Sequence, residues 1–337
     1  MDTLGVVSAP RITLDDVASA AGVSRMTVSN SYSRPERVAA ETRERVMAAA
    51  AELGYGGPSP VARTLRRGST GVLGLLLNDA LPYAFSDPGA GAFLRGLTVE
   101  AADADLALQI LRATGPTARA RVNDAAVDAF VTLALADDDP ALLAAVERRV
   151  PVVCSGSPAL PGVPCVTVDN VGACRRAAEH VVAQGYTRFA VVTWSLGTGV
   201  FRDRLQGWRR GLEAAGVDWS EVAVHERAGN NRAHGLQAGH RILDDVVGSE
   251  ERYAVLAATD VLALGVLQAA RERGVDVPAR LGVVGFDDVE EAETAGLTTV
   301  AQNLFAQGQE CARRASGLVT GPTRRHPTRL VVRRSTS

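Results

Sequence analysis

A short run near the start of the chain, residues 25–30 (RMTVSN), carries side chains that can contact nucleic acid. At helical spacing Val28 would face inward, toward a neighbouring helix. The side chains left facing outward, in position to enter a DNA groove, would be those of Arg25, Met26, Thr27, Ser29 and Asn30.

Two short helices joined by a tight turn would hold this run in place. Thr13 can cap the first helix, and Ser24 can cap the second. Gly22 permits the sharp turn between them. One apolar face of the first helix is formed by Val17, Ala18 and Ala21. The pattern predicts a helix-turn-helix, and an ordinary pair of surface helices is the alternative.

A third helix and a linker follow. The helix is expected over residues 40–53, ending at Gly54, with its apolar stripe formed by Thr42, Val46, Ala49 and Leu53. Glycine and proline then mark a linker, in which Pro60 can begin a short helix over residues 60–67. Isolated helices of this length are marginal, so this one should form only with outside support.

Composition limits the class of protein. The 337 residues suffice for two or three domains. No apolar run approaches the ~20 residues that span a bilayer, and no signal peptide is evident. We therefore expect a cytoplasmic protein without a membrane segment. The four cysteines lack metal or CxxC spacing, which favours reduced thiols and no metal site. Net charge is −2, but residues 1–70 hold nine arginines against seven acids, a modestly basic segment.

From residue 70 onward, apolar runs alternate with amphipathic ones. The strand candidates are residues 72–77, 106–111, 129–135, 152–154, 189–192, 253–257 and 282–285. The helix candidates are residues 92–104, 141–149, 172–184, 204–215, 233–245, 260–273 and 304–317. Continuous apolar strands between helices indicate parallel sheets covered on both faces. The length favours two doubly wound lobes, with a ligand site outside the carboxyl ends of the strands.

Several segments together resemble LacI-type (LacI/GalR) transcriptional regulators. They are RITLDDVASAAGVSRMTVSNSYS, VAAETRERVMAAAAELGY, PSPVARTLRRGSTGVLGLL, RDRLQGWRRGLEAAG, TDVLALGVLQAARERGVDVP and LGVVGFDD, in this order. The resemblance covers nearly the whole chain. It implies an all-α helix-turn-helix domain (1–58), a hinge helix and linker (59–69), and an α/β core (70–337) resembling periplasmic sugar-binding proteins. Lobe 1 of the core would hold residues 70–167 and 302–327, and lobe 2 residues 168–301 and 328–337.

The resemblance assigns DNA-contact roles. Arg25, Met26 and Asn30 match base-reading positions, where they suit guanine, a thymine methyl and adenine respectively. Leu65 matches a leucine that wedges into the minor groove. Positions expected to contact the DNA backbone or support the hinge are Thr13, Thr27, Ser29, Ser59 and Arg63. Alternatively, Met26 only packs, Asn30 is only solvated and Leu65 packs on its twin in a dimer. Ala39 stands where the family carries a serine cap.

An effector site is expected between the lobes. Asp287, in GFDD, matches an acid that accepts ligand hydroxyls, and Arg204 matches a ligand-binding arginine. The full set of expected positions is Asp79, Tyr83, Phe85, Trp194, Arg204, Thr259, Asp287 and Gln302. Fold-supporting ion pairs and core aromatics are the alternative reading. Residues 79–93 depart from the family's Asn-Pro-Phe-Phe pattern, and residues 89–94 (GAGAFL) form a lone Gly-x-Gly fragment expected in a loop.

These features predict a homodimeric repressor, with a tetramer as the alternative, that binds a palindromic double-stranded operator. A sugar-like effector would release it from DNA. No cofactor is expected, and no catalytic motif supports an enzyme. The alternatives are an activator, an effector that is a nucleoside or a phosphorylated partner protein, a binding protein for sugars or nucleosides without a DNA role, and an enzyme on the same lobes.

Overall fold

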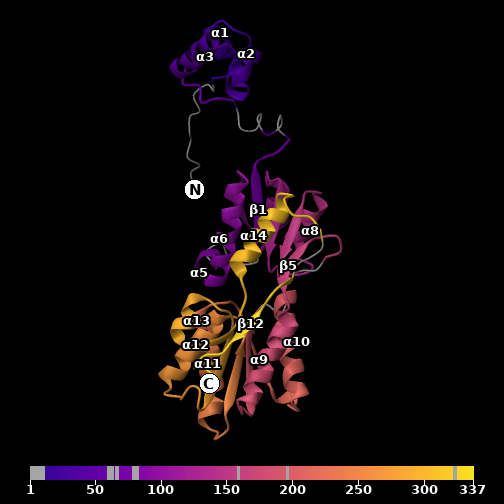
Figure 1. Cartoon of the computed structure of the whole chain (residues 1–337), viewed down its shortest axis with the longest axis vertical. Helices are drawn as coiled ribbons and strands as arrows, with labels where there is room; N and C mark the ends of the chain where they lie inside the picture. The colour runs from indigo at the N-terminus through magenta and orange to yellow at the C-terminus, as the bar shows by residue number, and fades with distance from the viewer. Residues whose placement is uncertain are drawn as a thin grey trace. The chain divides into compact units, whose positions relative to one another are not determined.

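The computed structural model describes residues 12–58, 64, 68–77, 83–157, 160–194, 197–321 and 325–337, without the side chains of residues 83 and 84. The chain forms two compact units, Met1–Thr70 and Gly71–Ser337 (Figure 1). Most of the predicted hinge helix lies outside the described residues, as do Ser59, Arg63, Leu65 and Asp79.

The first unit is a small bundle of helices. They are α1 (Leu14–Ala21), α2 (Arg25–Ser33), the 3-10 helix η1 (Pro35–Arg37) and α3 (Ala40–Glu52). A capping box between Thr13 and Asp16 begins α1, and Ser24 caps α2 by accepting from the amide of Thr27. Gly22 ends α1 at φ 63°, in the left-handed region that glycine tolerates. The predicted helix-turn-helix geometry is therefore present.

The apolar stripe predicted for α3 is partly wrong. Val46 and Ala49 are buried as expected, but Leu53 is 36% exposed. Because α3 ends at Glu52, the chain turns before Leu53 can reach the core. Ala50 is buried there instead, and Tyr55 packs edge-on against Tyr32 with ring centroids 6.0 Å apart.

The second unit contains two six-stranded sheets. Sheet 1 has the order β11 (Arg325–His326), β5 (Cys165–Val168), β4 (Val152–Ser155), β3 (Ala129–Leu133), β1 (Val72–Leu77), β2 (Ala107–Arg112). Sheet 2 has the order β12 (Arg329–Val331), β10 (Thr298–Ala301), β9 (Leu281–Asp287), β8 (Tyr253–Ala257), β6 (Arg188–Trp194), β7 (Ala223–Arg227). All neighbouring strands are parallel except the β10–β12 pair. The predicted doubly wound parallel sheets are confirmed, with one antiparallel edge strand added.

Helices cover both sheets. Those of lobe 1, the layer around sheet 1, are α5 (Tyr83–Ser86), α6 (Pro88–Asp103), α7 (Ala118–Asp124), α8 (Pro140–Glu147) and α14 (Leu304–Ala315). Those of lobe 2, around sheet 2, are α9 (Asn170–Ala183), α10 (Gly199–Ala214), η2 (Trp219–Glu221), α11 (Arg232–Val247), α12 (Asp260–Glu272) and α13 (Glu290–Ala295). The buried apolar residues of lobe 1 lie on both faces of its sheet, and those of lobe 2 form one continuous cluster.

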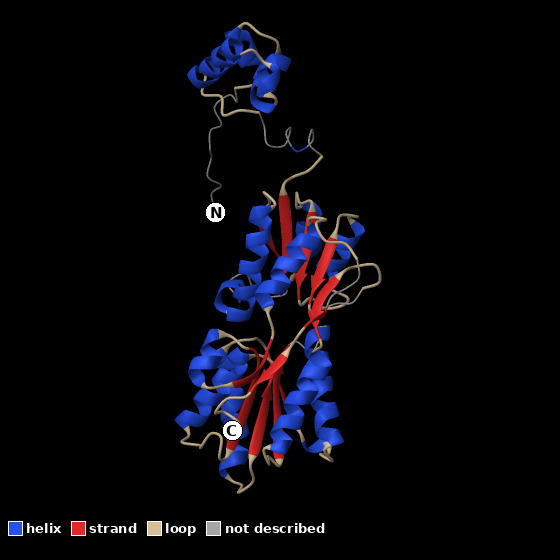
Figure 2. Ribbon diagram, viewed as in Figure 1, coloured by secondary structure: helices blue, strands red, loops and turns tan. Residues whose placement is uncertain are grey.

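The chain passes between the lobes three times: after β5, between β10 and α14, and between β11 and β12 (Figure 2). In lobe 1, α6 and α14 pack backbone against backbone. A Cβ built on Gly96 would lie 1.9 Å from the carbonyl oxygen of Phe305, and one on Gly308 would lie 2.1 Å from that of Phe93. Only glycine fits at these two positions.

Residues 89–94 do not form the expected loop. Asp87 caps α6 by accepting from the amide of Gly89, and Pro88 occupies the first turn, so the helix begins before the Gly-x-Gly fragment and runs through it. None of the helices in the described ranges has the length and apolar content that a membrane crossing needs.

Candidate functional site

The outward face of α2 is accessible as predicted from its spacing. The Arg25 side chain is 69% exposed, and Met26 is 72% exposed. Thr27, Ser29 and Asn30 are half-buried on the same helix. Arg25 lies 3.5 Å from Asp15, but both side chains are mostly exposed. Such a pair is weak in water, so a phosphate or a base could replace Asp15 at little cost.

Two of the expected phosphate contacts also serve the local fold. The Thr13 hydroxyl donates to Asp16 at 2.7 Å, and Asp16 lies in the first turn of α1. This hydrogen bond and a second one from the backbone amide of Thr13 lower the pKa of Asp16. The Thr27 hydroxyl lies 2.9 Å from that of Ser24. Either threonine would have to share or redirect its hydroxyl to contact a phosphate.

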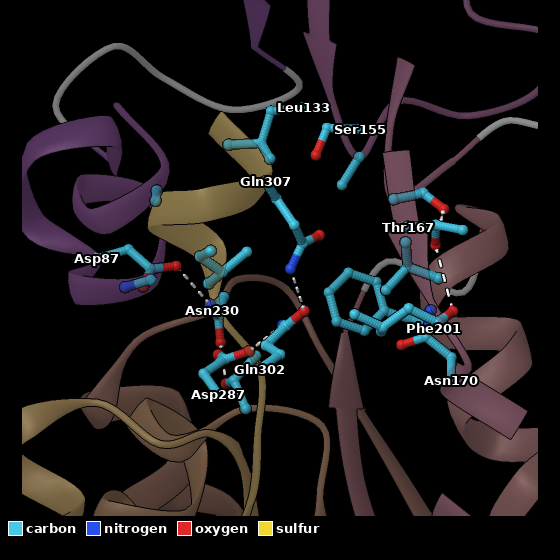
Figure 3. Close-up of a pocket in the computed structure, with 18 of the residues that line it drawn as sticks. Asp87, Leu133, Ser155, Thr167, Asn170, Phe201, Asn230, Asp287, Gln302 and Gln307 are labelled. Atoms are coloured by element: carbon cyan, nitrogen blue, oxygen red, sulfur yellow. Dashed lines mark hydrogen bonds between the residues drawn. The ribbon is translucent and has the colours of Figure 1, made fainter. Parts of the chain in front are cut away.

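A pocket of about 800 Å³, including its open mouth, lies between the two lobes of the core (Figure 3). Five expected effector positions line it: Trp194, Arg204, Thr259, Asp287 and Gln302. Phe85 does not line it and is 77% exposed, because α5 presents this side chain to solvent. The side chain of Tyr83, like the whole of Asp79, lies outside the described residues.

Arg204 is held rigidly at the floor of the pocket. Its Nε donates to Asn170 Oδ1 at 3.0 Å, and its Nη1 donates to the carbonyl of Ala258. The guanidinium lies 3.6 Å from the ring centroid of Phe286. Its Nη2 is 3.9 Å from Asp287 Oδ1, and the side chain is 5% exposed. The planar group is thus preorganised to hydrogen-bond oxygens above it.

Asp287 ends β9 with an unusual backbone, φ 122°, of the kind often found at functional sites. Its Oδ1 accepts from Gln302 Nε2 at 2.6 Å. Burial raises the pKa of Asp287, against the opposing charge of Arg204. Burial also raises the pKa of Asp260, which accepts from Thr299 at 2.6 Å below the pocket. Of these two carboxyl groups, only that of Asp287 lines the pocket, where it is placed to accept hydrogen bonds from hydroxyls.

Several pocket residues were missed in the sequence. The polar ones are Asp87, Ser155, Thr167, Asn170, Asn230 and Gln307. Most follow or end a parallel strand or begin a helix at the carboxyl edge of a sheet, which is the signal that could have found them. Asn230 was missed because β7, which precedes it, is too polar to read as a strand.

An aromatic wall completes the pocket. Trp194 and Phe201 have ring centroids 5.3 Å apart and planes tilted by 57°. Their apolar faces could stack on the apolar face of a ring-shaped ligand. In the parts of the chain that the structure describes, no three His, Cys, Asp or Glu residues gather to hold a metal ion. All four cysteines are free and buried, and burial raises the pKa of Cys154 to about 11.

Comparison with known proteins gives matches for both units. Residues 13–57 match the family described as bacterial regulatory proteins, lacI family, and residues 178–336 match a periplasmic binding protein-like domain. An HTH-type transcriptional regulator of Mycolicibacterium smegmatis is 36% identical over 340 residues, covering 93% of this chain and 91% of that one. The HTH-type transcriptional regulator CelR of Thermobifida fusca is 33% identical, covering 96% of each chain.

Solved structures also match nearly the whole chain. The Lac repressor dimer bound to operator and the anti-inducer ONPF matches with a TM-score of 0.76 at 27% identity, covering 97% of this chain and 99% of that one. The complex of CelR with cellobiose matches with a TM-score of 0.68 at 30% identity, covering 96% of this chain and all of the other.

Proposed function

Because the chain belongs to the LacI family of DNA-binding transcriptional regulators, we propose that it is a repressor released from its operator by a sugar-like polyol. Like its relatives, it is a transcriptional regulator and not an enzyme. The observation that carries the effector proposal is the polar floor of the cleft, where Arg204 and Asp287 lie together beneath an aromatic wall.

The DNA-reading part of the proposal rests on α2. A palindromic operator would present one half-site to each subunit of a homodimer in the cytoplasm. Exposed Arg25 would pair with guanine O6 and N7, Asn30 with adenine, and Met26 with a thymine methyl. Leu65 would enter the minor groove between the two half-sites, and Ser59 and Arg63 are proposed to support the hinge or contact the DNA backbone.

The effector chemistry follows from the mixture of donors and acceptors. A hydroxyl both donates and accepts, and so fits between a guanidinium and a carboxyl or amide group. Arg204 offers donors, Asp287 offers acceptors, and the side-chain amides of Asn170, Gln302 and Gln307 offer both. The Trp194–Phe201 wall supplies the apolar surface that the face of a sugar or cyclic polyol can cover.

A thermal-shift screen of sugars, cyclic polyols and nucleosides, followed by operator binding, tests the proposal. Operator sequences would first be selected from random DNA with the full chain. A true effector at ~100 times its Kd adds about 2.7 kcal/mol to stability and should weaken operator binding measured by fluorescence anisotropy. Arg204→Met should abolish the shift, whereas Arg209→Met, on the exposed side of the same helix, should keep it.

Three outcomes would contradict parts of this proposal. A nucleoside as the sole hit would overturn the polyol assignment. A hit that tightens operator binding would make the molecule a corepressor. A hit that persists undiminished in Arg204→Met would place the effector elsewhere.

A further inference from the structure

Three side chains connect the start of a helix in lobe 2 with the start of a helix in lobe 1. At α12, the amide of Leu262 donates to Thr259 Oγ1 at 3.5 Å, and the Thr259 hydroxyl donates to Asn230 Oδ1. Asn230 Nδ2 donates to Asp87 Oδ2 at 2.8 Å, across the cleft. Asp87 Oδ1 accepts from the amide of Gly89 at 2.8 Å, at the start of α6. Figure 3 shows Asp87 and Asn230 facing one another.

The direction of this chain of bonds is fixed by its two ends. Each helix start supplies a backbone donor, so Thr259 and Asp87 both accept there. The Thr259 hydroxyl proton then points at Asn230 Oδ1, which leaves the amide NH₂ of Asn230 facing Asp87. The α6 dipole also favours a negative charge at Asp87. All three side chains are buried, with Asp87 at 7%, Asn230 at 4% and Thr259 at 4% exposure.

A second inter-lobe contact lies elsewhere and differs in kind. Arg202 of α10 pairs with Asp137 of lobe 1 at 2.7 Å, and Ala136 makes a backbone bridge to Thr198. The Arg202 and Asp137 side chains are 47% and 53% exposed, so water screens their attraction. The Asp87–Asn230 bond is buried and has a carboxylate acceptor, which makes it the stronger kind of contact.

We propose that the Asp87–Asn230 hydrogen bond is a latch that holds the two lobes closed over the pocket. The two residues come from different lobes and both line the pocket, so the lobes cannot separate there while the bond remains. If a ligand enters only when the lobes are apart, its apparent affinity is its intrinsic affinity multiplied by the fraction of molecules that are open. The latch therefore sets how readily any ligand enters, whichever effector the cleft takes.

The donor–acceptor direction permits a swap of the two side chains. Asp87→Asn keeps the α6 cap, because asparagine caps about as well as aspartate, but it turns an NH₂ group toward the NH₂ of Asn230. Asn230→Asp sets two carboxylates against each other. The double variant D87N/N230D restores one donor and one acceptor, with Thr259 still able to donate.

Hydrogen–deuterium exchange of residues 87–91 and 228–232 in the full chain without ligand measures the opening. Each single variant should exchange about tenfold faster than the parent, because a buried hydrogen bond to a charged group typically favours the closed state by about a factor of ten. The double variant should return to within about twofold of the parent. Asp137→Ala, which removes the exposed ion pair with Arg202, should change these segments less than about twofold.

Whole-lobe motion needs a second readout. Spin labels on cysteines introduced at Leu143 and Gln206, on exposed positions of α8 and α10, would report the distance between the lobes, since the native thiols are buried. The single variants should shift or broaden this distance, and the double should restore it. The latch is overturned if the double exchanges as fast as the singles, or if exchange rises while the distance stays the same. If a single variant does not fold, the melting temperature of the double variant becomes the test. A value close to the parent's supports the pairing of residues 87 and 230, and a value far below it overturns the pairing.

Discussion

Replacing Arg204 by methionine should destabilise lobe 2 by about 3 kcal/mol. The substitution removes the donors to Asn170 and to the carbonyl of Ala258, both buried. Each acceptor that loses its donor costs ~1–3 kcal/mol, and the loss of stacking on Phe286 costs about 1 kcal/mol more. Methionine keeps apolar packing against the ring, and the raised pKa of Asp287 lets that carboxyl become neutral without its arginine, so the low end of the sum applies.

The assay is urea unfolding followed by tryptophan fluorescence. The three tryptophans, Trp194, Trp208 and Trp219, all lie in lobe 2, so the signal reports on the lobe that contains Arg204. Arg209→Met is the matched control on the same helix. Its guanidinium pairs with Glu213 one turn away, is 55% exposed and lies 5.9 Å from the ring centroid of Trp219, so a change of at most about 1 kcal/mol is expected. A loss below 1 kcal/mol for Arg204→Met would refute the view that this guanidinium is part of the lobe's internal bonding.

Four further outcomes are expected. Ala39→Ser should stabilise the first unit by about 1 kcal/mol, because α3 begins without a side-chain cap; an unchanged helix melting curve would count against this. Arg25→Ala should cost ~1–3 kcal/mol in operator binding and relax one base pair in each half-site, whereas uniform weakening across sequences would make Arg25 a phosphate contact. Burial raises the pKa of Asp287 above its unfolded value of about 3.9, so the unfolded chain releases this proton at lower pH than the folded chain does. The free energy of unfolding therefore falls as pH rises from about 4 through the folded pKa. Asp287→Asn should flatten that slope in urea titrations at several pH values. Leu65→Ala should weaken operator binding, and an unchanged affinity would dismiss the minor-groove wedge.

Local signals made the first unit readable from sequence. Helix caps and turns depend on residues within three or four positions, so Thr13, Gly22 and Ser24 could be assigned without knowing the fold. The exposed face of α2 followed from helical period alone. The predicted burial of Leu53 was wrong because helical periodicity does not indicate where a helix ends.

The core was predictable where strands are buried on both faces, as in β1, β8 and β9. The edge strands β7, β11 and β12 were not predicted because they are polar or very short. The interior strands β5 and β10 were also missed, because each has only four residues and β10 begins with a pair of threonines. The pocket residues likewise divide into those that a local sequence pattern predicts and those that it does not. Asp287 and Arg204 carry recognisable local motifs, whereas the pairing of Asp87 with Asn230 joins residues 143 positions apart. No local pattern contains that information.

The contact between α6 and α14 limits how lobe 1 can move. With glycine at Gly96 and Gly308, no side chains lie between the two backbones that could repack to absorb a shift. A displacement at the start of α6, where Asp87 sits, must therefore carry α14 with it. Because α14 follows directly from a segment that crosses to lobe 2, such a displacement would also move one end of that crossing. The close packing of two helices about 200 positions apart in sequence thus connects the start of α6, beside the pocket, with a chain crossing between the lobes.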